Sequence, residues 1–93
     1  MSGSEVDSVV SVLVGILVEQ LNVSTPREQI DANASLEDDL GLDSVAMVEL
    51  IGAIETEFGF EFLDSDLRIS VFQNLRSLAK VIADRLRPSA ALV

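Results

Sequence analysis

The sequence predicts an all-α fold: a small bundle of three long helices plus one short helix, with a long loop between helices one and two. Three observations predict it. Apolar residues recur three and four positions apart over three separate stretches. The 93 residues suffice for one domain and are too few for two. Apolar residues make up 48% of the chain and aromatic residues only 4%, so the core must consist mainly of valine, leucine and isoleucine. We therefore expect a single domain over residues 1–93, with a helical core at about 4–87 and a flexible tail at 88–93.

The first helix is expected to start at Ser4-Glu5-Val6-Asp7, which has the Ser-x-x-acid form of a helix N-terminus. The many valines that follow could also indicate a strand. The stretch is too long for a strand, however, and runs on to Glu19-Gln20-Leu21. The apolar positions at helical spacing are Val6, Val9, Val10, Leu13, Leu17 and Leu21.

Residues 22–43 are expected to form the long loop, because they are rich in Asn, Ser, Asp and Pro. Loops of this length are uncommon in small domains and tend to carry function. Leu36, Leu40 and Leu42 are spaced so that they could pin this loop to the core.

The second helix should begin at Asp43 or Ser44, since either side chain can cap it, and should end at Gly59. Its apolar stripe is Met47, Leu50, Ile51, Ile54 and Phe58. A connector with Phe60 and Phe62 follows, and Asp64 to Ile69 is expected to form the short helix. The last helix should open at Ser70-Val71-Phe72-Gln73, a capping-box pattern, and end at Pro88. Its apolar stripe is Phe72, Leu75, Leu78, Ile82 and Leu86.

The charge distribution excludes several classes of partner. The formal net charge is −10, and the stretch from Glu37 to Asp66 has ten acidic residues and no basic one. Nucleic acid and anionic membranes are therefore not expected as partners. The acidic stretch is either a solvated face or a docking surface for partners with basic patches.

Composition also bears on the compartment. The chain has no cysteine, and its N-terminus lacks the basic segment of a secretory signal. The most apolar run, from Val9 to Val18, is too short to cross a bilayer. We therefore expect a cytoplasmic protein.

Ser44 is the residue whose chemistry needs explanation. A catalytic serine needs a base, yet the chain has no histidine, and its one lysine, Lys80, lies in the last predicted helix. A calcium loop counted from Asp38 fails, because its sixth position is Asp43 rather than glycine. No metal site is expected. The remaining possibilities are that Ser44 caps the helix, or that another enzyme modifies it near the positive end of the helix dipole.

The segment Asp38-Asp39-Leu40-Gly41-Leu42-Asp43-Ser44-Val45, followed by Val48-Glu49-Leu50, closely resembles the attachment motif of acyl carrier proteins. The resemblance extends from about Glu5 to Leu86 and suggests a discrete, free-standing (type II) carrier with no catalytic activity of its own. In that family a magnesium-dependent phosphopantetheinyl transferase moves 4′-phosphopantetheine from coenzyme A to the serine. The thiol of this arm then carries acyl groups as thioesters between enzymes.

The resemblance also implies roles for particular residues. Ser44 would be the attachment site, with Asp43 beside it. The predicted partner-binding residues are Ala46, Met47, Val48, Glu49, Gly52 and Glu55. The residues predicted to pack the core, and in addition to line an acyl-chain pocket, are Leu50, Ile54, Phe58, Phe62 and Leu78. Other expected partners are acyl- or aminoacyl-loading enzymes, ketosynthases and acyltransferases, acting on a monomer.

Some residues depart from the usual pattern of the family. Val45 replaces the usual Leu, Ala46 stands where fatty-acid carriers commonly have an acid, and Gly52 replaces a larger apolar residue. Gly52 also weakens the helix by roughly 1 kcal/mol relative to alanine. These departures favour a carrier in polyketide or related specialised-metabolite biosynthesis. The alternatives are a carrier of primary fatty acid synthesis and an acidic helical adapter that carries nothing.

Overall fold

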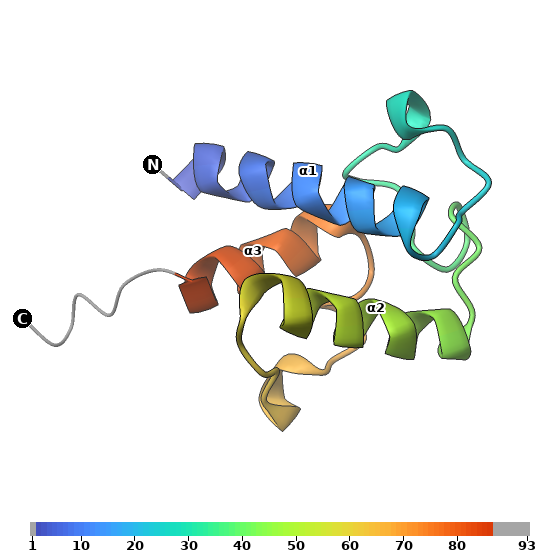
Figure 1. The fold of residues 1–93 in the computed structure, drawn as a ribbon. Coiled ribbons are helices and arrows are strands. Elements are labelled where there is room, and N and C mark those ends of the chain that lie inside the picture. Colours follow the sequence, from blue (N-terminus) through green and yellow to red (C-terminus); the bar gives the residue numbers. More distant parts are fainter. Residues whose placement is uncertain (1, 87–93) are drawn as a thin grey trace, which may run out of the picture.

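The computed structural model describes residues 2–86 (Figure 1), and Met1 and residues 87–93 lie outside the described part. Within residues 2–86 there are three α-helices, α1 (Ser2–Glu19), α2 (Ser44–Phe58) and α3 (Leu75–Leu86). Two short 3-10 turns, η1 (Arg27–Gln29) and η2 (Asp64–Asp66), lie in the connections. The all-α prediction is therefore confirmed. The expected short fourth helix, however, is only the single turn η2.

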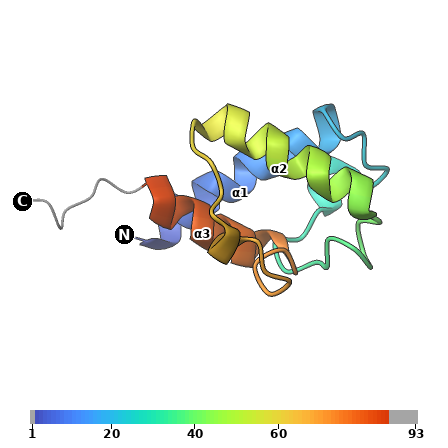
Figure 2. The ribbon, with the colours of Figure 1, turned by 90° about the horizontal axis from the view of Figure 1, so that it is seen from below.

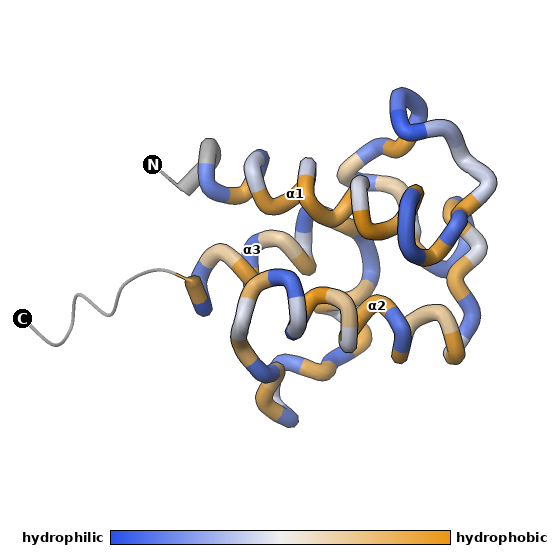
Figure 3. Tube along the Cα trace, viewed as in Figure 1, coloured by the Kyte–Doolittle hydropathy of each residue, from blue (hydrophilic) through white to orange (hydrophobic). Residues whose placement is uncertain are grey.

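Helix α1 packs more closely against α3 than against α2, and the three helices enclose one core (Figures 1 and 2). Along α1 the hydrophobic residues lie on the side turned towards the other two helices (Figure 3). The core is aliphatic, as predicted, and every aromatic ring is only half-buried. The largest fully buried side chains are Leu13, Leu17, Leu36, Leu50, Ile54, Leu75, Leu78 and Ile82.

Helix α1 begins at Ser2, so the predicted start at Ser4 is two residues late. Its end is set by Asn22, which has a left-handed φ of 56°. The N–H of Leu21 donates to Ile16 O at 3.1 Å, and that of Val23 donates to Leu17 O at 3.1 Å. These bonds satisfy carbonyls of the last turn and divert the chain into the loop. No helix among residues 2–86 is long and apolar enough to cross a membrane.

The loop between α1 and α2 is pinned as its leucines predicted. Leu36, Leu40 and Leu42 are all buried in the core. The N–H of Leu36 donates to Gln73 O at 3.0 Å, and the N–H of Leu42 donates to Leu36 O at 2.9 Å. The segment that leads into α2 therefore has a fixed course, and this fixes the position where α2 begins.

Helix α3 begins at Leu75, so the predicted start at Ser70 is wrong by more than a turn. Asn74 is the residue that caps it: its Oδ1 accepts from the N–H of Ser77 at 2.8 Å, and its own N–H donates to Ser77 Oγ at 3.3 Å. The preceding residues cannot join the helix because Gln73 O accepts from the pinned loop, with Ser35 bridging to Asn74. The expected end at Pro88 and the tail 88–93 lie outside the described residues.

The connector after α2 is held at two points. The N–H of Phe62 donates to Glu55 Oε2 at 2.9 Å. Arg85 of α3 pairs with Asp66, donates to Glu61 O at 3.2 Å, and lies over the ring of Phe60. The N–H of Leu63 donates to Asp66 Oδ2 at 2.8 Å.

These contacts shift the pKa of Asp66. The hydrogen bond from the Leu63 N–H, aided by the Arg85 guanidinium, lowers the pKa of Asp66 below its ordinary value of 3.8, although burial acts in the opposite direction. Both contacts favour the ionised carboxylate, so Asp66 is a charged anchor of the connector.

Candidate functional site

The start of α2 shows which residue caps the helix. The side chain of Asp43 is the cap: its Oδ1 accepts from the N–H of Ala46 at 2.8 Å, while its backbone O accepts from the N–H of Met47 at 2.9 Å. Ser44 is therefore the first residue of the helix. Since Asp43 performs the capping, the Ser44 hydroxyl is not used for that purpose.

Ser44 is exposed, and its hydroxyl makes no hydrogen bond within residues 2–86. In the described part of the chain no carboxylate or amine is bonded to it; the chain has no histidine, and its one lysine, Lys80, lies on α3. The hydroxyl cannot act alone as a nucleophile, but an outside enzyme can reach it. The first turn of α2 also offers free backbone N–H groups and the positive end of the helix dipole to a phosphate attached there.

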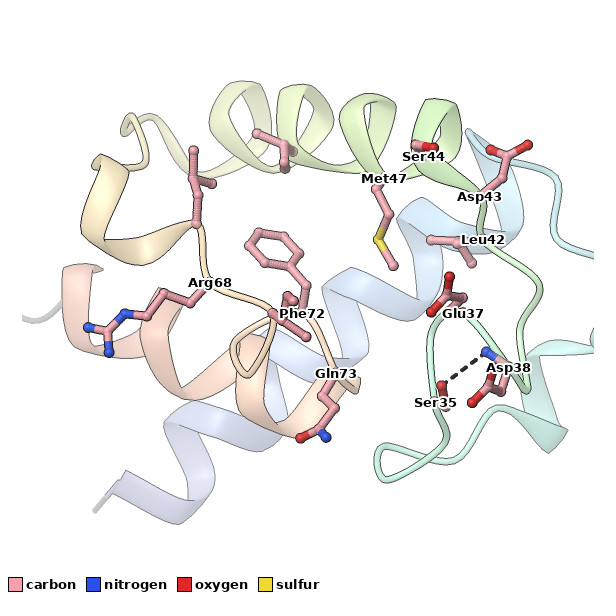
Figure 4. A pocket seen from close by; sticks show the side chains of 13 residues that line it. Ser35, Glu37, Asp38, Leu42, Asp43, Ser44, Met47, Arg68, Phe72 and Gln73 are labelled. Carbon is pink, nitrogen blue, oxygen red and sulfur yellow. Dashed lines mark hydrogen bonds between the residues drawn. The ribbon is translucent and has the colours of Figure 1, made fainter.

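The acidic loop before α2 is partly locked by its own carboxylates and hydroxyls. The N–H of Ser35 donates to Asp39 Oδ2 at 2.8 Å, and the N–H of Asp38 donates to Ser35 Oγ at 3.0 Å (Figure 4). Gly41 has a φ of +72°, a left-handed conformation that glycine adopts without strain. The loop therefore presents Glu37 and Asp38 to solvent on a rigid backbone.

Ser44 lies at the edge of a hollow of 680 Å³ between α2, the acidic loop and the connector that precedes α3 (Figure 4). Met47 points from α2 towards the loop, and Phe72 faces α2 from the other side, whereas the guanidinium of Arg68 points away from Ser44. The apolar residues that line the hollow are Leu42, Met47, Ile51, Leu67, Ile69 and Phe72. The polar residues are Ser35, Glu37, Asp38, Asp43, Ser44, Arg68 and Gln73. An apolar chain attached near Ser44 would have a matching surface beside it.

The six predicted partner-binding residues do not all share one face. Val48, Glu49 and Gly52 are exposed on the outer side of α2, and Val48 is 67% exposed. Ala46 and Met47 are half-buried and line two separate hollows that flank the start of the helix.

Glu55, the sixth of these residues, is half-buried, and its carboxylate accepts the N–H of Phe62. This carboxylate therefore already has a role within the fold, because it ties the connector to α2.

The five residues predicted for the core and for an acyl-chain pocket divide into two groups. Leu50, Ile54 and Leu78 are fully buried in the core, while Phe58 and Phe62 are half-buried. None of the five lines the hollow beside Ser44. Phe62 packs against Phe72, whose ring does line it, with ring centroids 5.7 Å apart.

Sequence reasoning missed several residues of this region. Ile69 is 90% exposed, and together with Leu67 and Phe72 it forms the connector side of the hollow. Phe72 was assigned to the buried stripe of the last helix, yet it precedes that helix. Val45 beside Ser44 is 68% exposed. One signal was available for Ile69: it is a large apolar residue between the charged Arg68 and the polar Ser70, outside any periodic stripe.

Among residues 2–86 there is no group of three or more acidic side chains placed to hold a metal ion. The chemistry that this region offers is therefore that of an exposed, uncommitted hydroxyl beside an apolar hollow.

Comparison with known proteins agrees with this geometry. The model of the family described as "Phosphopantetheine attachment site" matches residues 11–82. An acyl carrier protein of Saccharopolyspora erythraea is 38% identical over 77 residues, which is 82% of this chain and 79% of that protein. An acyl carrier protein of Bdellovibrio bacteriovorus is 49% identical over 51 residues, which is 55% of this chain and 63% of that protein.

Two solved structures share the fold. The holo acyl carrier protein of Nitrosomonas europaea superposes with a TM-score of 0.69 at 28% identity, over 82% of this chain and 92% of that one. A structure of a Bradyrhizobium japonicum glycine:[carrier protein] ligase complexed with glycylated carrier protein matches with a TM-score of 0.60 at 26% identity, over 88% of this chain and 97% of that one. The chain therefore belongs to the acyl carrier protein family and bears 4′-phosphopantetheine as its covalent prosthetic group.

Proposed function

We propose that Ser44 is the attachment site and that the chain is a free-standing, non-catalytic carrier. The observation that carries this proposal is the free hydroxyl of Ser44 at the first position of α2, with Asp43 as the cap. A serine that served only as a cap would have its oxygen bonded to a backbone N–H. The oxygen of Ser44 is exposed instead.

The chain exposes the Ser44 hydroxyl at the start of α2, and the transferase activates it. The Oγ of Ser44 forms a bond to the phosphorus that carries pantetheine in coenzyme A, the pyrophosphate P–O bond breaks, and 3′,5′-ADP leaves. Within residues 2–86 no side chain is hydrogen-bonded to the Ser44 hydroxyl, and Asp43 Oδ1 accepts from the N–H of Ala46, so we assign removal of the hydroxyl proton to a base of the transferase. Asp43 keeps the first turn of α2 formed while this happens. Once attached, the group supplies a terminal thiol that holds acyl groups as thioesters.

The hollow beside Ser44 is the place where the cargo would rest. Its floor is formed by Met47, Ile51 and Phe72, and Ile69 lies at its exposed edge. Burial of an apolar chain against these side chains is favourable by roughly 25 cal/mol per Å² of apolar surface removed from water. Leu50, Ile54 and Leu78 are fully buried in the core and do not line this hollow.

The pathway we favour is polyketide or related specialised-metabolite biosynthesis, with primary fatty acid synthesis as the alternative. The support is the outer face of α2, which has Val45, Val48 and Gly52, and has no acidic residue in its first turn. Ketosynthases, acyltransferases and loading enzymes would meet this face. An adapter that carries nothing does not account for the prosthetic group.

One comparison favours a second kind of cargo. The neighbour whose title names glycylated carrier protein matches nearly its whole length to this chain at 26% identity. An aminoacyl group on the same thiol is therefore the second candidate. Incubation of the holo protein with glycine, ATP and that ligase would distinguish the two: a mass gain of one glycine supports aminoacyl cargo, and no gain with glycine but loading by an acyl donor supports acyl cargo.

The test of the attachment site is the intact mass of the protein after incubation with coenzyme A, Mg²⁺ and a phosphopantetheinyl transferase of broad specificity. We expect the wild type to gain one phosphopantetheine and Ser44→Ala to gain none, with equal helicity by circular dichroism. Ser8 on α1 is a matched control, because it is also an exposed serine on a helix. If Ser44→Ala is still loaded, the assignment is wrong.

A further inference from the structure

A second hollow lies at the end of the molecule opposite Ser44. Helix α1 begins on this side, and helices α2 and α3 end there (Figures 1 and 2). The hollow has a volume of 310 Å³, and the residues that line it are Glu5, Ser8, Val9, Val12, Phe58, Ala83 and Leu86. Phe58, the last residue of α2, is about 21 Å along the helix axis from Ser44. A group bound in this hollow therefore leaves the Ser44 hydroxyl accessible.

The lining of this hollow is mainly apolar. Val9 and Ala83 are buried. Phe58 is half-buried, and Leu86 is 43% exposed. Among the described residues that line the hollow, only Glu5 carries a charge. A segment with apolar side chains and a basic residue would therefore match this surface, because apolar burial is favourable and opposite charges attract.

The residues that follow Leu86 in the sequence have this chemistry. They are Arg87-Pro88-Ser89-Ala90-Ala91-Leu92-Val93, which contain one basic residue, no acidic residue and an unbroken apolar run over 90–93. Proline disfavours helical backbone at the residue before it, so α3 is not expected to continue beyond Arg87. The segment is therefore free to leave the axis of α3 beside the hollow.

The segment is also long enough to cross the hollow. Leu86 itself lines the hollow, so the segment starts at its edge. An extended chain from Leu86 to Leu92 spans at most about 20 Å. The part of α1 that lines the hollow runs from Glu5 to Val12, which is about 10 Å of helix. A short covalent link also gives the segment an effective concentration in the millimolar range, which favours it over a free partner.

We propose that residues 88–93 fold back across this hollow and that Leu92 packs against Val12. Arg87 then lies beside Glu5. The segment is an intramolecular cover that joins the start of α1 to the ends of α2 and α3. Segments that flank a domain stay mobile unless contacts tie them down, and this hollow supplies such contacts. The segment therefore contributes to the stability of the fold, while Ser44 at the other end stays open to the transferase.

The experiment is a double-mutant cycle on the unmodified protein, read as the melting temperature by circular dichroism. We expect Leu92→Ser to lower the melting temperature by roughly 4–8 °C, because a large apolar side chain loses its contacts. In the Val12→Ala background the same change should have about half that effect, since the two side chains share a contact. Ile69→Ser is the matched control: Ile69 is 90% exposed and lies outside this hollow, so its shift should stay below about 3 °C.

Backbone amide NMR spectra provide a second measurement that does not depend on stability. Leu92→Ser should shift the amide signals of Ser8, Val12 and Phe58, which line the hollow, and leave that of Ser44 unchanged. Loading of Leu92→Ser by the transferase should proceed at the wild-type kcat/KM, because the hollow is remote from Ser44.

Three results would overturn the inference. Unchanged melting temperature and unchanged amide signals in Leu92→Ser would show that the segment does not cover the hollow. Strictly additive effects of Val12→Ala and Leu92→Ser would show that Leu92 packs elsewhere. Amide shifts in the wild type that grow with protein concentration, together with dimers in sedimentation, would assign the hollow to a second copy of the chain. The melting and NMR measurements need no prosthetic group, so their outcome is independent of the proposed role of Ser44.

Discussion

Glu55 offers a sharp test, because sequence reasoning assigns its carboxylate to partner docking whereas the structure bonds it to the connector. Its Oε2 accepts the N–H of Phe62 at 2.9 Å in a half-buried setting. A hydrogen bond to a charged group contributes about 1.5–3 kcal/mol, and partial exposure places this one at the low end. We therefore expect Glu55→Ala to lower the free energy of unfolding by about 1.5 kcal/mol.

The melting temperature makes this loss measurable. In a domain of this size each 1 kcal/mol shifts the melting temperature by roughly 4–8 °C, so Glu55→Ala should melt roughly 6–12 °C lower. Glu55→Gln keeps an acceptor oxygen but loses the charge. Since a neutral hydrogen bond has about half the strength of a charge-assisted one, its shift should be about half as large.

The matched control is Glu49→Ala, because Glu49 is exposed on the same helix and makes no hydrogen bond or ion pair within residues 2–86. Its melting temperature should change little, as surface substitutions usually stay within about 0.5 kcal/mol. The assay is thermal unfolding followed by circular dichroism at 222 nm. Equal melting temperatures for Glu55→Ala and Glu49→Ala would refute the structural role of Glu55.

Three further predictions concern stability. Asp43→Ala removes the cap of α2 and should lower the free energy of unfolding by about 1 kcal/mol in thermal unfolding, with Asp43→Asn nearly neutral because it still caps. Since the pKa of Asp66 is lowered in the fold, its contribution to stability is present above pH 3.8 and is lost as pH falls through the folded pKa. The difference in urea midpoint between wild type and Asp66→Asn should therefore be largest at pH 7 and shrink steadily as pH is lowered below 3.8. Repulsion within the basic-free stretch from Glu37 to Asp66 should make the melting temperature rise with NaCl or Mg²⁺, and a salt-independent value would contradict this.

The helices and their core could be predicted because their signals are local. Apolar residues at helical spacing identify α1, α2 and α3, and the left-handed Gly59 ends α2 where glycine was expected. The start of α3 could not be predicted in the same way. Ser70 and Asn74 both offer capping patterns, and the choice depends on a long-range bond, from the Leu36 N–H to Gln73 O. The hydrogen bond between the loop and Gln73 therefore selects Asn74, and not Ser70, as the residue that caps α3.

In the candidate site, too, some residues could be predicted from local sequence and others could not. Ser44 and Asp43 follow from a short motif, so they could be named from the sequence. The hollow beside them is assembled from α2, the acidic loop and residues 67–73, which meet only in the folded chain. Helical periodicity placed Met47 in the apolar stripe of the second helix, and the family resemblance placed it among the partner contacts. In the structure Met47 is half-buried and lines the hollow beside Ser44.

The acidic stretch has two distinct roles, and only one of them can steer partners. Of the ten acidic residues between positions 37 and 66, four use their carboxylates to accept backbone N–H groups: Asp39, Asp43, Glu55 and Asp66. Electrostatic docking must therefore come mainly from the uncommitted ones, such as Glu49 and Glu57, which are exposed on α2. Neutralising Glu49 should slow partner association at low salt and leave folding intact, because steering acts through exposed charge. Neutralising Asp39 should instead lower the free energy of unfolding and have little effect on electrostatic steering, because its carboxylate holds the loop that positions Ser44. A carrier of this size thus uses the same residue type to build the approach to its serine and to attract the enzymes that act on it.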